Sequence, residues 1–104
     1  METNFAELDS IIHSRVRLAI MVLLLQTESA NFTYLKKEID VSDGNLSSHL
    51  RKLEEAKYIK MKKSFENRKP KTAISLTDKG RTALDEYTKN LEEYLHLVSE
   101  NKQK

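Results

Sequence analysis

Apolar and polar positions recur along the chain with two different periods, which predicts helices followed by one pair of strands and a last helix. Phe5, Leu8, Ile11 and Ile12 have the spacing of one helical face. The next segment, Ser14 to Gln26, is apolar nearly all round. A helix without a polar face has to be covered on several sides, so we expect this segment at the centre of the core, with Ser14 as its N-cap.

A short helix and a longer one are predicted next. Thr33 is a candidate N-cap for a helix over residues 34–39, and Phe32 could lie in a very short strand just before it. Ser42 is the candidate N-cap of the longer helix, which should end near Ala56. The buried face of this longer helix is fixed by three leucines at intervals of four and three residues: Leu46, Leu50 and Leu53.

Two strands are predicted after the longer helix, over residues 58–65 and 72–76. The intervening residues, Glu66 to Lys71, include Asn67 and Pro70 and are typical of a turn. This loop is longer than the two-residue turn of a tight hairpin, so we expect its tip to be mobile.

The last helix should begin at Thr77, which is its candidate N-cap. Its tyrosines and leucines are spaced by three and four residues over two heptads, a pattern typical of helix pairing. We therefore predict a dimer interface at Leu84, Tyr87, Leu91, Tyr94, Leu95 and Val98. The alternative is that these side chains cover the core of their own chain.

Charge is unevenly distributed along the 104 residues, a length that fits one domain. The whole chain has a net charge of +2, but residues 51–71 contain nine basic and three acidic side chains, a local net charge of +6. The remainder therefore has a net charge of −4. This concentration favours a polyanion partner at residues 51–71, although a solvated lysine-rich surface would have the same composition.

Several kinds of chemistry find no support in the sequence. There is no cysteine, so disulfides, thiolate metal sites and cysteine nucleophiles are excluded. His13, His49 and His96 lack metal-ligand spacing, and the only two glycines form no phosphate-binding loop. The apolar run at residues 18–25 is too short to span a bilayer. We expect a cytoplasmic protein that is not an enzyme and has no metal or cofactor.

Three stretches of the sequence resemble known transcriptional regulators. One stretch, NLSSHLRKLEEAKYI, resembles the recognition helix and following strand of ArsR- and MarR-type regulators from bacteria and archaea. Their wing, with the start of the next helix, is similar to RKPKTAISLTDKGR, and the first helix of a small single-domain winged-helix family is similar to LDSIIHSRVRLAIMVLLL. The resemblance implies a dimeric, sequence-specific DNA-binding repressor or activator.

Two features depart from these families. They usually have glycine after the recognition helix, where this chain has Lys57. A lysine in the left-handed conformation of such a position would cost on the order of 1 kcal/mol. Many ArsR-type proteins sense metals through cysteines, and because this chain has none, metal sensing does not carry over.

Pattern and resemblance together predict a mainly α (α+β) fold, a winged helix-turn-helix in the order α-α-(short β)-α-α-β-β-α with a C-terminal dimerisation helix. The single domain would span residues 1–104. Its parts would be the N-terminal helices (1–26), the helix-turn-helix (32–56), the wing (58–76) and the dimerisation helix (77–99).

This fold predicts double-stranded DNA as the partner, bound by a homodimer on a near-palindromic site. Short polar and basic side chains of the recognition helix should approach base edges and phosphates, and basic side chains of the wing should contact phosphates or the adjacent minor groove. The predicted DNA-binding residues are Ser42, Asn45, Ser47, Ser48, Arg51 and Lys52 in the helix and Lys62, Lys63, Arg68, Lys69 and Lys71 in the wing.

Other partners were weighed against DNA. The main alternative is a winged-helix module for protein–protein interaction without DNA binding. RNA binding is less favoured because no surface platform of aromatic side chains is evident. A groove between the dimer helices and the DNA-binding part could admit a small-molecule effector, whose identity the sequence does not indicate.

Overall fold

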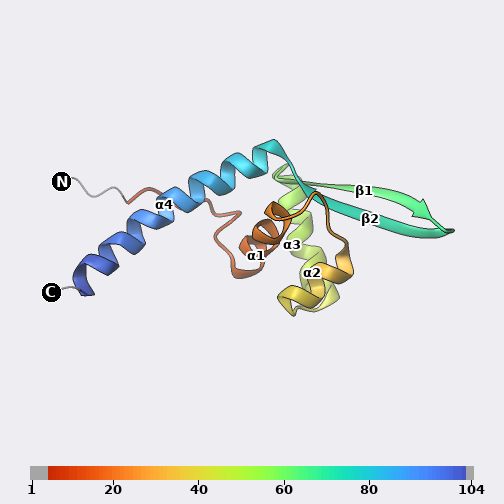
Figure 1. Ribbon diagram of the computed structural model, residues 1–104, viewed down its shortest axis with the longest axis horizontal. Coiled ribbons are helices and arrows are strands. Elements are labelled where there is room, and N and C mark those ends of the chain that lie inside the picture. Colours follow the sequence, from red (N-terminus) through yellow and green to blue (C-terminus); the bar gives the residue numbers. More distant parts are fainter. Residues whose placement is uncertain (1–4, 103–104) are drawn as a thin grey trace.

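Four helices and one β-hairpin make up this computed structural model, which describes residues 5–102. Their order is α1 (Arg15–Leu25), α2 (Phe32–Ile39), α3 (Asp43–Glu55), β1 (Ile59–Glu66), β2 (Lys69–Leu76) and α4 (Asp78–Lys102). Helices α1, α2 and α3 form a small body, from which the hairpin projects on one side and α4 on the other (Figure 1). The predicted mainly helical winged helix-turn-helix is confirmed.

The core lies where α1, α2 and α3 meet the base of the hairpin and the first turns of α4. All three leucines predicted for the inner face of α3, Leu46, Leu50 and Leu53, are buried. Helix α1 contributes four buried side chains, as expected for the central helix: Val16, Ile20, Met21 and Leu24. It is nevertheless not covered all round, because Val22 and Leu25 are exposed.

Residues 5–12 do not form the predicted helix, and the prediction for residues 1–4 lies outside the described part. The Asp9 carboxylate accepts the backbone N–H of Ile11 at 2.8 Å, a local turn that competes with helix formation. Further along, the Tyr94 hydroxyl of α4 donates to the Ala6 carbonyl at 2.7 Å. These bonds hold an irregular segment against α4, and the first helix of the chain begins at Arg15.

Two of the predicted helix starts are confirmed, and one is displaced. Ser14 accepts from the backbone of Arg17, and Ser42 accepts from that of Asn45, as N-caps do. Helix α2 begins earlier than predicted because Asn31, not Thr33, is its N-cap; asparagine is the stronger capping residue.

The short strand expected at Phe32 is also displaced, since Phe32 is the first residue of α2. The extended contact is a single β-bridge two residues earlier. There Ala30 and Ile74 exchange both backbone hydrogen bonds, each 2.8 Å long. This bridge attaches the loop before α2 to strand β2.

The hairpin ends in a tight two-residue turn, so the predicted longer loop was wrong. Strands β1 and β2 stay paired out to Glu66 opposite Lys69, which leaves only Asn67 and Arg68 in the turn. Both turn residues have positive φ, 52° and 65°, as a type I′ turn requires. Pro70 pairs with Phe65 next to the turn-closing pair, where the alternating pattern needs no N–H from proline.

The end of α3 is a left-handed cap at Lys57, whose φ is 66°. The Lys57 N–H bonds the Glu54 carbonyl at 2.9 Å and the Tyr58 N–H bonds the Leu53 carbonyl at 3.0 Å, the pair of bonds of a Schellman motif. Lysine therefore adopts the left-handed conformation itself, and the helix does not end in a different way.

The predicted cap at Thr77 is confirmed, and it also connects the start of α4 to the end of α3. Its hydroxyl accepts from the Gly80 N–H at 2.9 Å and donates to the Lys57 carbonyl at 2.7 Å. At Gly80, a Cβ atom would lie 2.1 Å from the Tyr58 carbonyl oxygen, so only glycine fits. The threonine and glycine shared with the regulator motif thus fix how α4 leaves the hairpin.

Candidate nucleic-acid interface

The outer face of α3 is polar and open to solvent. Because the three leucines of this helix face the core, its other side chains point outward. All six residues predicted to bind DNA from this element are exposed: Ser42, Asn45, Ser47, Ser48, Arg51 and Lys52. The N-terminal end of α3, with its unpaired N–H groups, lies among the short side chains.

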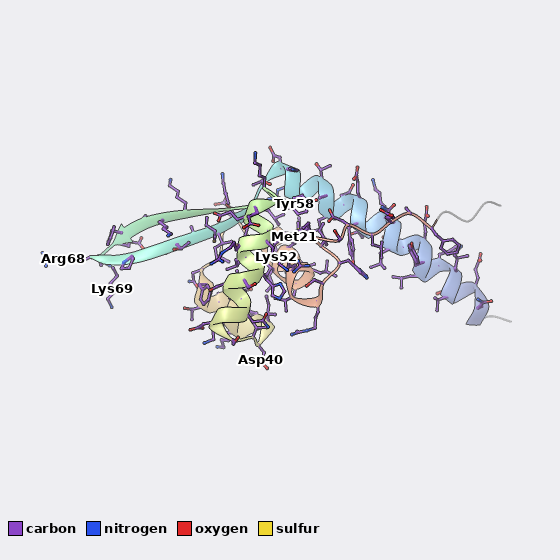
Figure 2. All side chains as sticks on the ribbon, turned by 180° about the vertical axis from the view of Figure 1, so that it is seen from behind. Met21, Asp40, Lys52, Tyr58, Arg68 and Lys69 are labelled. Carbon is purple, nitrogen blue, oxygen red and sulfur yellow. The ribbon has the colours of Figure 1, made fainter. Side chains whose placement is uncertain are left out.

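The five predicted wing residues are also exposed: Lys62, Lys63, Arg68, Lys69 and Lys71. Figure 2 places Arg68 and Lys69 at the end of the hairpin, well away from Lys52 on α3. The predicted contacts therefore fall into two groups, one on the helix and one along the projecting wing.

Strand register divides the wing into two faces, since successive side chains point to opposite sides of a strand. One face contains Lys60, Lys62, Lys69 and Lys71, and we call it the lysine face. The other face begins at the hairpin base with apolar pairs that join the core. Towards the tip this second face has Lys63, Phe65, Pro70 and Thr72.

Two acidic side chains near the interface are neutralised by lysines. Asp43, in the first turn of α3, forms an ion pair of 2.7 Å with Lys36 of α2. Glu66 forms one of 2.9 Å with Lys71, and this hydrogen bond and charge hold the pKa of the Glu66 carboxyl below its usual value. Of the five predicted wing residues, Lys71 alone has an ion pair within residues 5–102.

Arg17 holds α3 against α1, a contact that sequence patterns did not identify. Its guanidinium donates to Nδ1 of His49 on α3 at 2.9 Å and to the carbonyl of Ile11 at 2.5 Å. His49 is the acceptor, so this contact requires neutral imidazole. Burial lowers the pKa of His49, and the charges of Arg17 and Lys52 lower it further. His49 therefore has a structural role.

Hydrogen bonds of tyrosine hydroxyls hold the segment before α1 in place. Tyr58, at the base of the hairpin, donates to the Asp9 carboxylate at 2.5 Å. Burial and this acceptor raise the pKa of Tyr58 to about 12. Tyr87 of α4 shares a 2.9 Å hydrogen bond with His13, so His13 also has a structural role. These long-range bonds make residues 6–13 a connection between α4 and the DNA-binding part.

The predicted dimer interface is split by the structure. Leu84 and Tyr87 are buried in the core of their own chain, so they leave no surface for a partner. Leu91 and Tyr94 are half-buried. Leu95 and Val98 are 57% and 55% exposed, on the part of α4 that projects beyond the body.

A further apolar side chain lies next to this exposed end of α4. Phe5 is 65% exposed, and its ring centroid is 5.7 Å from that of Tyr94. The sequence offered no signal for this contact, because Phe5 was assigned to a helix that does not form.

A hollow of about 380 Å³ lies between the N-terminal segment and α4. The groove that the sequence analysis allowed for an effector involves the helices of a dimer, so this hollow within one chain does not test that prediction. Its lining includes the carboxylates Glu7, Asp9 and Glu86, so it would repel an anionic ligand. Within residues 5–102, no three metal-ligating side chains come together and no helix is long and apolar enough to cross a membrane.

The family model of the winged helix DNA-binding domain matches residues 16–95, from α1 into the second half of α4. The chain belongs to this family. An uncharacterized protein of Methanocaldococcus jannaschii is 44% identical to this winged helix DNA-binding domain over 77 residues, which cover 74% of the chain and 84% of the relative.

Two solved structures resemble the fold of this winged helix domain. A transcriptional regulator homologue from Pyrococcus horikoshii OT3 has 34% identity and a TM-score of 0.70, over 86% of this chain and 85% of that one. A transcriptional regulator of the MarR family from Enterococcus faecalis V583 has 19% identity and a TM-score of 0.80, over 91% and 86%. The predicted resemblance to MarR-type regulators is confirmed.

Proposed function

We propose that this winged helix protein is a sequence-specific transcriptional regulator that binds double-stranded DNA as a homodimer on a near-palindromic site. One observation supports this most strongly. The polar face of α3 and the basic wing are both fully open to solvent, with all eleven predicted contact residues exposed. The match to the winged helix DNA-binding domain family supports the same proposal.

In this proposal α3 enters the major groove, whose width of about 12 Å matches the diameter of a helix with its side chains. Asn45 has the amide that pairs with adenine, and Arg51 has the guanidinium that pairs with a guanine edge. Ser48 is short enough to let the helix approach closely. The wing lysines then bind phosphates, which strengthens binding to every sequence and makes it sensitive to salt.

Dimerisation would involve the exposed apolar end of α4. Leu95, Val98 and Phe5 are large apolar side chains that their own chain leaves open. A two-fold dimer formed there would present two copies of α3 to the same side of a duplex. Their separation should be about 34 Å, one helical turn of DNA, which is why the site should be near-palindromic.

The alternative of a protein–protein interaction module predicts a different surface. Under it, the lysines would be scattered over the molecule or the wing would fold onto the core. Instead the hairpin projects from the body (Figure 1) and ends in Arg68 and Lys69 (Figure 2). This geometry favours a long polyanion as the partner.

Selection of bound sequences from a pool of random duplexes tests the proposal. We expect a consensus with two inverted half-sites about one helical turn apart. The double variant Ser48→Ala, Arg51→Ala should then lose discrimination between the consensus and mismatched duplexes. Recovery of no enriched duplex would refute the proposed function, and a uniform loss of affinity in the variant would remove the base-contacting role of α3.

A further inference from the structure

Phe65 is 78% exposed, the highest value among the exposed large hydrophobic side chains of residues 5–102. It is the second-last residue of β1 and pairs with Pro70 across the hairpin. In an antiparallel pair without hydrogen bonds, facing side chains lie close together, so Pro70 supports the ring from the opposite strand. The wing thus has an apolar projection at its tip that phosphate binding does not use.

The hairpin holds this projection at a defined distance from the body. The last pair on this face that packs with the core is Met61 with Ile74. Five residues further along β1, at about 3.3 Å each, the strand ends at Glu66, about 17 Å away. Half a helical turn of DNA has about the same length, since one turn is about 34 Å. With α3 in the major groove, the hairpin is therefore long enough for its tip to reach the neighbouring minor groove.

The immediate surroundings of Phe65 are basic. Lys63 lies two residues before it on the same face and Arg68 is in the turn, whereas Lys69 lies on the opposite, lysine face. An apolar side chain with cations so near is unsuited to the apolar surface of another protein, because those cations would lose water without gaining a partner. Such a side chain suits the minor groove, because phosphates line the groove and its floor consists of the edges of stacked base pairs.

We propose that Phe65, supported by Pro70, is an apolar wedge that inserts at a base step of the minor groove beside each half-site and bends the DNA. The proposal rests on the proposed function. Aromatic wedges partly unstack the step they enter and kink the duplex away from the minor groove, towards the major groove. Pyrimidine–purine steps unstack most easily, so the protein gains a sequence preference at positions that α3 does not contact.

The test compares DNA bending by the wild-type protein, Phe65→Ala and Phe65→Leu. The probe is a duplex recovered from the random pool, labelled with a fluorescence donor and acceptor at its two ends. We expect the wild-type protein to shorten the end-to-end distance and the alanine variant to restore it. Loss of a buried phenyl ring should weaken binding roughly tenfold or more, without changing the salt dependence, since no charge is removed.

Two variants serve as controls. Phe65→Leu retains an apolar wedge, so it should keep part of the bend. Val22→Ala removes another exposed apolar side chain, from α1 and outside both DNA-contacting elements, so it should bend DNA as the wild-type protein does. Because Phe65 is exposed, its replacement should leave thermal unfolding of the free protein unchanged.

The outcomes separate this inference from the proposed function. If the wild-type protein binds no duplex, both are refuted. If it binds and Phe65→Ala binds and bends the same duplex equally well, only the wedge is refuted. If sedimentation without DNA shows that Phe65→Ala changes self-association while bending is unaltered, Phe65 belongs to a contact between copies of the chain, and the wedge is again refuted.

Discussion

Replacement of Lys57 by glycine should stabilise the folded chain. Lys57 ends α3 in the left-handed conformation, at a φ of 66°. This conformation costs an L-residue with a Cβ atom about 1–2 kcal/mol. Glycine avoids that cost but loses more conformational freedom on folding, which offsets about 0.5–1 kcal/mol of it. The expected net gain in free energy of unfolding is therefore about 0.5–1 kcal/mol.

Thermal unfolding followed by circular dichroism measures this gain. For a domain of this size, 1 kcal/mol corresponds to about 4–8 °C in Tm, so Lys57→Gly should melt about 2–8 °C higher. The protein concentration has to be the same for all variants, because the Tm of a dimer depends on it. A higher Tm with unchanged DNA binding would confirm that Lys57 is a strained helix cap.

Lys57→Ala is the matched control. It removes the same charge but keeps a Cβ atom in the left-handed conformation, so it should not stabilise. It should even lose a little, because a lysine near a helix C-terminus interacts favourably with the helix dipole. If alanine raises the Tm as much as glycine does, removal of charge and not relief of backbone strain is the cause, and the explanation given for this position fails.

Three further results are expected. Replacing Arg68 and Lys69 by alanine should weaken binding to all duplexes and reduce the slope of log affinity against log salt by about two per chain bound; an unchanged slope would exclude the wing tip from the phosphates. Leu95→Asp should dissociate the proposed dimer without unfolding the chain, because Leu95 is already exposed within its own chain, and a variant that still sediments as a dimer would place the interface elsewhere. The pKa of Tyr58 is raised from 10.0 to about 12, so its contribution to stability is full below pH 10 and is lost as pH rises towards 12. Denaturant unfolding of Tyr58→Phe should therefore show a smaller alkaline loss of stability than the wild-type protein, and equal losses would refute the raised pKa of Tyr58.

Features set by neighbouring residues were predictable from the sequence. The inner face of α3 follows from the spacing of Leu46, Leu50 and Leu53, and each of them is buried. Ser42 and Thr77 cap the helices that follow them, because a hydroxyl needs only the N–H groups of the next turn. The end of α3 at Lys57 was also indicated by the family motif, although the sequence left open whether lysine adopts the left-handed conformation there.

The geometry of the hairpin turn was harder to predict from the sequence, even though neighbouring residues determine it. Asn67 with Arg68 lacks the glycine that usually marks a type I′ turn, and Pro70 suggested a longer loop. The structure shows that proline is accepted because its position in the ladder requires no N–H. As a result, the sequence placed Phe65 next to a long loop, although it is paired with Pro70 beside a two-residue turn.

The sequence by itself determined the helices of the DNA-binding part, their caps and the basic character of the wing, because periodicity, capping and charge act between residues close in the chain. Only the tertiary structure decided the state of residues 5–12, since Tyr94 and Tyr58 bind this segment from 88 and 49 positions away. It also decided which apolar residues of α4 are free for a partner: Leu84 lies in the core, whereas Val98 lies beyond it. Heptad spacing is the same for both, and only the extent of the body along α4 distinguishes them.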